Sequence, residues 1–457
     1  MSKFDQRLEK LAKASEVVKE NREDLVDSIV DTSYLDKEFA GLDVDTLAYV
    51  FSDYEKLIDY LNEKGFDMGN RVGQGNVAAI LPYNGPLMTF ALAFAGSYIW
   101  DENHLTIKPA GESQPVFEKL KQFLGNKGLG DLLTNQDGSP VLSDLSGRTF
   151  LPNMLLPESG VKVLEHYGHD SMITPALEES LRQNPNVRYI LEGPGKNRVI
   201  VTRSANNPER IADIMLKVGL LNSGQSCMAG EIYDVHEGVH DEVVKQVVKQ
   251  AANYGVGDPS NPQNKIGPLK RGLAQNIEKQ IRNSIENGAK VEFMTPIAHT
   301  SIGPFSFHPG DPNKEFALLR YEKNPNYLYV PVTVLSGVTD KMKIRTLETF
   351  GPIIPIHKYN KTSELSQGIK DARYGLEMTI IGEPDKELLD LTKGNAGHVF
   401  RDAHFLEPGQ FDILLSPWGG EKYSRFSLQG TTVNGKPALL KTQTGPDYIV
   451  LDFSKPK

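Results

Sequence analysis

Apolar residues follow two spacings along this chain, one typical of helices and the other typical of buried strands. In 4–64 they recur every three or four positions with charged residues between them, which predicts amphipathic helices. After a Gly-rich segment, 77–81 and 104–108 are short apolar runs, and each leads into a helical pattern. Strands that alternate with helices are typical of a parallel, doubly wound sheet.

The same alternation continues and predicts two α/β units. The first unit includes three further apolar runs, at 160–164, 188–191 and 198–201. A second unit begins at about residue 204 and has a predicted strand at 231–235. The alternating segment 448–453 predicts a C-terminal strand without an obvious neighbour. We expect it to pair with a Gly-rich hairpin at 66–76 in a small β element that joins subunits.

Length and charge narrow the classes of function. The chain has 457 residues, more than one hydrophobic core usually serves, so we expect two or three domains. The formal net charge is -9 and no Lys/Arg-rich stripe is present, which argues against nucleic acid and anionic membranes as partners. Because no run of about 18 apolar residues occurs, we expect no membrane insertion.

Cys227 is the only cysteine of the chain. It therefore forms no intramolecular disulfide and no cysteine-based zinc site, and we expect a cytoplasmic protein without a bound metal. It lies in Asn-Ser-Gly-Gln-Ser-Cys-Met-Ala-Gly (222–230), among small and polar residues after an apolar helix. Structural thiols usually lie among aliphatic side chains, whereas a nucleophile needs access and polar surroundings. On this segment alone both roles remain open.

Glu192 is a candidate general base. It lies in Leu-Glu-Gly-Pro-Gly-Lys-Asn (191–197), where a carboxylate ends a predicted strand just before a Gly-Pro-Gly turn. Such a turn lets backbone approach a ligand closely, and a carboxylate beside a water-poor pocket has a raised pKa that suits proton transfer. The alternative is a surface turn with a solvated glutamate.

Together the two segments resemble the aldehyde dehydrogenase superfamily, in which a glutamate motif precedes a Gly-Gln-x-Cys loop as Glu192 precedes Cys227 here. Four further segments are similar to family motifs and occur in the family's order: Pro-Tyr-Asn at 82–84, Ile-Lys-Pro-Ala at 107–110, Glu-Thr-Phe-Gly-Pro at 348–352 and Pro-Trp-Gly-Gly-Glu-Lys at 417–422. Each motif alone is a weak signal. Their common order over nearly the whole chain makes the resemblance specific.

The resemblance implies an α/β fold with two doubly wound parallel domains, one Rossmann-like, and a small β oligomerisation element. An NAD(P)-binding domain is expected at 1–203, a catalytic domain at 204–420, and a return segment with the C-terminal oligomerisation strand at 421–457. The expected substrate is a small-molecule aldehyde. The expected assembly is a homodimer or homotetramer.

The resemblance also implies a catalytic role in aldehyde oxidation for each of three residues. The Cys227 thiolate would attack the carbonyl carbon, and the Asn84 amide with the Cys227 backbone N–H would bind the resulting oxyanion. Glu192 would activate the water that clears the thioester. Taken without the family context, Asn84 is equally well explained as a turn residue between two prolines.

For the cofactor, NAD or NADP, the resemblance implies five binding residues. Lys108 would donate to ribose hydroxyls, and Glu348 would accept from the nicotinamide ribose beside Phe350. Gly168 and Ser171 would lie near the pyrophosphate. Without the family context, Lys108 and Glu348 would be explained as surface residues.

Two departures from the family pattern concern the cofactor. The segment 165–172 keeps only Gly168 of the usual motif, although residues 169–171 are predicted to open the following helix, where the helix dipole favours an anion. Asp170 would repel a phosphate unless it points away. Gly111 occupies the position where an acidic residue favours NAD over NADP, and the acid appears one residue later as Glu112.

Three rival functions remain open. An acyl-CoA or fatty-acyl reductase of this superfamily uses the same cysteine thioester in the opposite direction, but it can dispense with the water-activating glutamate. A non-catalytic relative with a degenerate cofactor loop would not need Cys227, Asn84 and Glu192. A cysteine hydrolase would leave the nucleotide-binding sheet unexplained.

Overall fold

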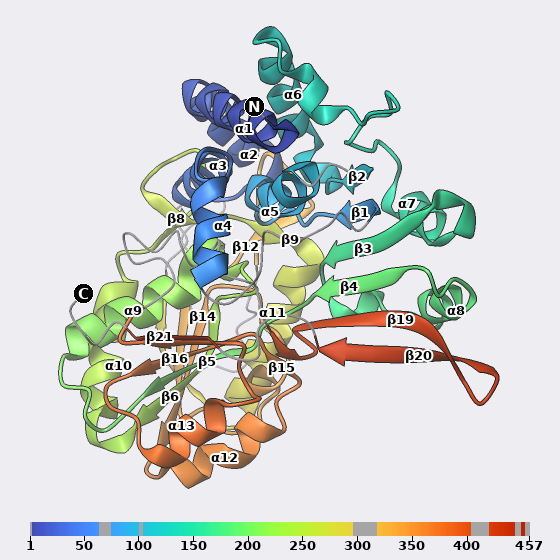
Figure 1. The fold of residues 1–457 in the computed structure, drawn as a ribbon. Helices are drawn as coiled ribbons and strands as arrows, with labels where there is room; N and C mark the ends of the chain where they lie inside the picture. The colour runs from blue at the N-terminus through green and yellow to red at the C-terminus, as the bar shows by residue number, and fades with distance from the viewer. Residues whose placement is uncertain are drawn as a thin grey trace.

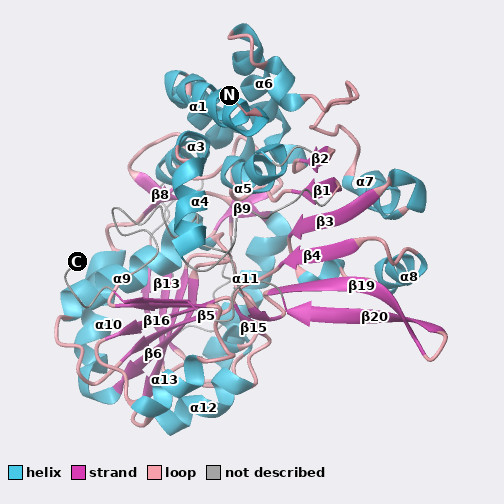
Figure 2. Cartoon of the chain, in the orientation of Figure 1, coloured by secondary structure: helices cyan, strands magenta, loops and turns pink. Residues whose placement is uncertain are grey.

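A computed structural model gives the structure of this chain, and it describes residues 2–63, 75–99, 104–295, 318–403, 420–443 and 449–452. Within these residues no helix is long and apolar enough to cross a membrane. The chain forms two α/β domains, each built around its own sheet. The N-terminal helices form a helical cap (Figure 1). Figure 2 shows that helices flank both sheets.

The N-terminal cap confirms the helical periodicity of the sequence. Its helices bury the apolar face that the spacing predicted, including Leu11, Leu25 and Leu47, all of which are fully buried. They pack on helix α5, whose first turn donates two backbone N–H groups to the buried carboxylate of Asp43. The helices are α1 (Lys3–Glu20), α2 (Arg22–Ser33), α3 (Lys37–Ser52), α4 (Tyr54–Glu63) and α5 (Pro86–Ile99).

The smaller sheet has the strand order β2-β1-β3-β4-β19-β20. Its first four strands are parallel, and β19 pairs antiparallel with both β4 and β20. Ala78 and Ala79, adjacent in β1, belong to hydrophobic clusters on opposite faces, so helices cover both sides. The strands are β1 (Asn76–Ile80), β2 (Leu105–Lys108), β3 (Val161–Tyr167), β4 (Arg188–Glu192), β19 (Arg425–Val433) and β20 (Lys436–Gln443), with helices α6 (Gln114–Asn126), α7 (Gly147–Leu155) and α8 (Pro175–Gln183).

The larger sheet has the strand order β10-β13-β14-β6-β5-β16-β17-β21 and is parallel except for β10. Val199 and Ile200, adjacent in β5, again belong to clusters on opposite faces. The strands are β5 (Asn197–Val201), β6 (Gly230–His236), β10 (Lys290–Met294), β13 (Thr333–Ser336), β14 (Ile353–Tyr359), β16 (Glu377–Ile381), β17 (His398–Arg401) and β21 (Ile449–Asp452). The helices are α9 (Pro208–Leu220), α10 (Glu237–Ala251), α11 (Arg271–Glu286), α12 (Thr362–Lys370) and α13 (Lys386–Thr392).

Short strands complete the larger domain. Strand β12 pairs antiparallel with β9 and β11, β15 pairs with β18, and β7 pairs with β8. These strands are β7 (Gly255–Val256), β8 (Asn264–Ile266), β9 (Leu269–Lys270), β11 (Leu319–Arg320), β12 (Tyr327–Tyr329), β15 (Tyr374–Gly375) and β18 (Glu421–Lys422).

The structure differs from the expected domain boundary at one strand. Strand β5 belongs to the larger sheet, so the chain leaves the first domain between Glu192 and Asn197 and not after 203. Both β4 and β5 are short apolar runs, and this pattern does not reveal which sheet a strand joins. Strand β21 pairs with β17 of the same chain, whereas the hairpin expected as its partner lies almost wholly outside the described residues. The homodimer or homotetramer stays a prediction.

Candidate active site

The loop that carries Cys227 begins with a strained turn. Helix α9 ends at Leu220, and Asn222, Ser223 and Gly224 then follow with φ of 49°, 59° and 76°. A non-glycine residue in this left-handed region costs about 1–3 kcal/mol, and such strain persists only where surrounding contacts enforce it. The Ser223 hydroxyl accepts from the Gly267 N–H at 2.8 Å, which is one such contact.

Cys227 is half-buried and lies against the segment that follows Glu192. The Asn197 amide Nδ2 donates to the Cys227 carbonyl oxygen at 2.8 Å and to the Ala229 carbonyl at 2.9 Å. A Cβ atom added to Gly195 would lie only 1.9 Å from the same Cys227 carbonyl. Only glycine permits this approach, which explains the second glycine of the Gly-Pro-Gly turn.

The surroundings of Cys227 disfavour the thiolate in the absence of a cation. Burial, followed by the negative charges of Glu348 and Glu192, raises the pKa of the Cys227 thiol to about 12. The carboxylates that the fold brings close to the sulfur therefore act against the thiolate. A cation beside the sulfur would offset them.

Asn84 contacts the cysteine loop directly. Its side-chain Nδ2 donates to the Gln225 carbonyl at 2.9 Å, and its own carbonyl accepts from Asn222 Nδ2 at 3.2 Å. An amide nitrogen carries two hydrogens, so a second donor remains for a ligand. The neighbouring Tyr83 hydroxyl donates to the Gln225 side chain at 2.7 Å. The structure thus brings Asn84 and the cysteine loop together, as the sequence predicted.

Glu192 ends β4 at the carboxyl edge of the smaller sheet. Its carbonyl accepts from the Gly168 N–H at 2.9 Å, which fixes the backbone. Its carboxylate lies 2.8 Å from Arg425 Nε, and its side chain is 10% exposed. Burial raises the pKa of Glu192 to about 8, even though Arg425 acts to lower it. A carboxylate with a pKa near neutrality is suited to general base catalysis.

Glu348 lies on the other side of the same turn. Its Oε1 accepts from the Gly195 N–H at 3.2 Å. Burial and the nearby charge of Glu231 raise the pKa of Glu348 well above its usual value. A ligand hydroxyl that hydrogen-bonds to the Glu348 oxygens would offset the free-energy cost of burying this carboxyl. The ribose contact that the resemblance implies would provide such a hydroxyl.

Phe350 is held in place by a buried carboxylate that the sequence did not single out. Its φ is 52°, and its backbone N–H donates to Glu231 at 2.6 Å. Glu231 also accepts from the Thr349 N–H at 2.8 Å and pairs with Lys196 at 2.7 Å. The Lys196 and Glu231 side chains are 3% and 4% exposed. This pair therefore fixes the loop that carries Glu348 and Phe350.

Lys108 ends β2 and is 6% exposed. Its ammonium donates to the carbonyl of the next residue, Pro109, and burial lowers its pKa. The side chain therefore lies at the carboxyl edge of the sheet, where doubly wound folds bind their ligands. A ribose hydroxyl would provide an acceptor there.

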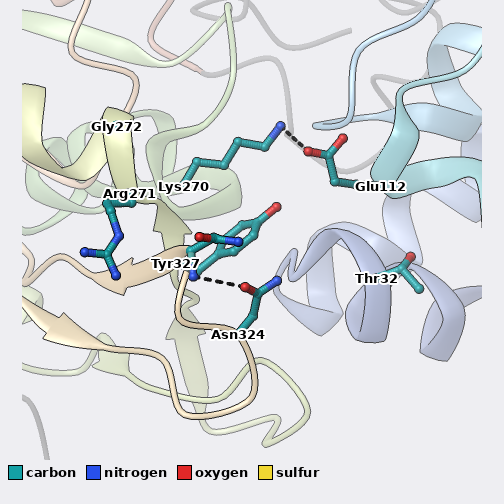
Figure 3. Close-up of a pocket in the computed structure, with 8 residues that line it drawn as sticks. Thr32, Glu112, Lys270, Arg271, Gly272, Asn324 and Tyr327 are labelled. Carbon is teal, nitrogen blue, oxygen red and sulfur yellow. Dashed lines mark hydrogen bonds and ion pairs between the residues drawn. The ribbon is translucent and has the colours of Figure 1, made fainter. Parts of the chain in front are cut away.

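Glu112 reaches across the domain interface to a lysine of the second domain. It pairs with Lys270 at 2.6 Å, and Lys270 Nζ lies 3.8 Å from the centre of the Tyr83 ring. Figure 3 shows this pair at one side of a pocket of about 340 Å³. Tyr327 lines the same pocket, and its buried hydroxyl has no hydrogen-bond partner among the residues that the structure describes. A Cβ atom added at Gly111 would meet no described atom within 4 Å.

The predicted pyrophosphate loop differs from expectation. Residues 170–172 form a separate 3-10 turn, and helix α8 begins later, at Pro175, with the Thr174 side chain as its cap. Ser171 is exposed and bonds to His169, so it does not open the helix. Asp170 points away from the loop: its carboxylate contacts the Tyr374 hydroxyl at 2.9 Å and Arg373 Nε at 2.9 Å. The predicted repulsion from Asp170 is therefore removed.

Sequence reasoning missed several residues that build the site. Lys196 and Asn197 directly follow the Gly-Pro-Gly turn, and their position beside it was an available signal. Glu231 and Arg425 begin ordinary strands. The fold decides which residues Glu231 and Arg425 contact, so the sequence around each of them shows no pattern that would predict the contact. The first half of the motif at 417–422 lies outside the described residues.

A comparison with known families agrees with this geometry. The model of the aldehyde dehydrogenase family matches residues 1–299 and 316–443. The chain belongs to the aldehyde dehydrogenase family. The cysteine loop, the Glu192 turn and the loop of Glu348 all lie within the matched residues.

Curated relatives of this family member include several aldehyde dehydrogenases. The chain is 25% identical to the 3-sulfolactaldehyde dehydrogenase of Priestia aryabhattai, over 84% of this chain and 70% of that protein. It is 25% identical to the D-glyceraldehyde dehydrogenase (NADP(+)) of Picrophilus torridus, over 83% of this chain and 72% of that protein.

Solved structures share the fold of this aldehyde dehydrogenase family member. One is the glyceraldehyde-3-phosphate dehydrogenase of Methanocaldococcus jannaschii complexed with NADP, with a TM-score of 0.73, 19% identity, and coverage of 96% of this chain and 90% of that chain. The lactaldehyde dehydrogenase of Escherichia coli has a TM-score of 0.71, 20% identity, and coverage of 97% and 87%. These likenesses confirm the expected α/β fold.

Proposed function

We propose that this protein oxidises a small-molecule aldehyde to a carboxylic acid, with NAD or NADP as hydride acceptor and Cys227 as covalent nucleophile. One observation carries the proposal. The turn after Glu192 packs on the Cys227 carbonyl through Gly195 and Asn197, while Asn84 contacts the same loop at the Gln225 carbonyl. Nucleophile, base and oxyanion donor are therefore held by one set of contacts.

In the first half of the reaction, the Cys227 sulfur forms a bond to the carbonyl carbon, and the carbonyl π electrons move to oxygen. The Asn84 amide and the Cys227 N–H stabilise that oxyanion, and each donor of this kind typically lowers the barrier by about 3–4 kcal/mol. The cofactor held by Lys108, Glu348 and Phe350 would supply an oxidised nicotinamide as the hydride acceptor, and its positive charge would favour the thiolate. A thioester on Cys227 results.

In the second half, Glu192 takes a proton from water as the water oxygen bonds to the thioester carbon. The carbon–sulfur bond then breaks, the thiolate is restored and the acid leaves with its new oxygen. Because Glu192 must be ionised to act, this half should become faster as pH rises through the pKa of Glu192, about 8.

For the cofactor, we propose that the site admits NADP as well as NAD. Lys108 and Glu348 would hold the two ribose groups, and Phe350 would lie near the nicotinamide ring. Gly111 brings no negative charge to the place where an acid favours NAD, and Lys270 draws Glu112 away. The Picrophilus relative named for NADP supports the same choice.

The test is a panel of aldehydes assayed for reduced nicotinamide, with NAD and NADP in parallel. Cys227→Ser should abolish the signal. Glu192→Gln should keep a single-turnover burst but lower steady-state turnover by about 10²–10⁴-fold, as loss of a general base does. Glu158→Gln, which changes an exposed carboxylate on the Pro157–Ser159 turn, is the matched control. Full turnover by Cys227→Ser would overturn the proposal.

A further inference from the structure

Arg425 and Glu192 occupy opposite positions on neighbouring antiparallel strands. In the pairing of β19 with β4, Arg425 lies directly across from Glu192, and its Nε is 2.8 Å from Glu192 Oε1. The two side chains are 18% and 10% exposed. Strands β19 and β20 come from the C-terminal part of the chain and extend the smaller sheet beyond β4 (Figure 1).

Two more titratable groups face Glu192 from β3. Tyr167 lies across from Glu192 in the β3–β4 pairing, and Glu165 is two residues earlier on the same strand. Arg425 lowers the pKa of both carboxyls, while the charge of Glu165 raises that of Glu192. Two half-buried carboxylates thus share one guanidinium, and the charge of Glu192 also acts on the thiol of Cys227 from its loop.

We propose that Arg425 is a positioning residue for Glu192, which keeps this carboxylate ionised and aimed at the thioester, and that Glu165 opposes it. The inference rests on the proposed role of Glu192 as the base. One guanidinium neutralises one carboxylate, so a second negative charge in the cluster makes protonation of either carboxyl easier. The balance between Arg425 and Glu165 therefore sets the pH at which Glu192 becomes active.

The strand pairing itself does not depend on this ion pair. Strand β19 is held by backbone pairing to β4 over five residues and to β20 over eight. The turn is fixed separately by the Gly193 N–H, which donates to the Ser424 carbonyl at 2.6 Å, and by the Ser424 hydroxyl, which donates to the Pro194 carbonyl at 2.7 Å. Loss of the Arg425 charge should therefore change the base more than the fold.

The test measures steady-state turnover against pH, together with the burst that reports formation of the thioester. The rising limb is the pH range over which turnover increases. Arg425→Gln should move this limb to higher pH by about one unit, so that turnover at a pH below the limb should be about tenfold lower than in wild type. Glu165→Gln should move the limb to lower pH. Arg425→Lys should restore the wild-type limb in large part. The control is Lys441→Gln, which removes a positive charge from β20 where Lys441 contacts Tyr423 and not Glu192.

The outcomes separate this inference from the proposed function. If Glu192→Gln keeps full steady-state turnover, Glu192 is not the base and both fail. If Glu192→Gln stops turnover after the burst but Arg425→Gln and wild type have superimposable pH profiles, only the inference fails. If Arg425→Gln does not fold, as judged by circular dichroism, Glu165→Gln decides the matter, because an unmoved limb in that variant overturns the inference by itself.

Discussion

Replacement of Gly195 by alanine tests how closely the Glu192 turn holds the nucleophile. The new Cβ would lie 1.9 Å from the Cys227 carbonyl oxygen, whereas ordinary van der Waals contact begins at 3.4 Å. The turn and the cysteine loop must therefore separate by about 1.5 Å, because the atom in contact is backbone and has no rotamer to change. A displacement of about 1 Å at a reacting group can cost about 10²-fold in rate. We expect Gly195→Ala to lower kcat at least that much.

The assay compares burst amplitude, kcat and melting temperature of the purified variant with wild type. Overpacking of this kind costs about 1–3 kcal/mol of stability, so the protein should still fold. Gly147→Ala is the matched control, because a Cβ at Gly147, the first residue of α7, meets nothing within 4 Å. A Gly195→Ala enzyme with wild-type burst and kcat would refute the reasoning, since the contact would then not position the thiol.

Three further predictions concern other contacts of the site. Asn84→Ala should lower kcat by about 10²–10³-fold with little change in melting temperature, because one oxyanion donor is lost; an unchanged kcat in the steady-state assay would count against that role. Gly111→Glu should weaken NADP binding at least tenfold by isothermal titration while NAD binding is kept, because it restores an acid where space is free; equal losses for both cofactors would contradict this. Lys196→Met should destabilise the protein by about 3–5 kcal/mol in urea unfolding, because it leaves Glu231 buried without its cation, and a change below about 1 kcal/mol would show that the pair is not structural.

Helices and strands could be predicted where the spacing of apolar residues within a single segment indicates them. The runs at 77–81 and 104–108 became β1 and β2, and the alternation with helices gave the doubly wound class. Sheet membership could not be predicted, because β4 and β5 present similar apolar runs and differ only in which neighbours they pair with. For this reason the domain boundary was placed one strand too late.

The site could be predicted in its parts but not in its electrostatics. Motif order predicted Cys227, Asn84 and Glu192 as candidate site residues, and the structure brings their segments into contact. That burial and the nearby Glu348 and Glu192 raise the pKa of the Cys227 thiol could not be predicted, because both effects depend on distances set by the fold. Arg425 was invisible for the same reason, since it lies more than two hundred positions from Glu192 along the chain.

The return of β19 and β20 to the smaller sheet has a consequence for biosynthesis. During synthesis, nearly all of these residues must leave the ribosome before β19 can pair with β4 and Arg425 can contact Glu192. Contacts of such long sequence separation form late and slowly, so the N-terminal half should emerge with an open sheet edge that is prone to aggregation. Under the proposed function, the water-activating step would then be the last to become competent, because Glu192 meets Arg425 only after β19 has paired with β4.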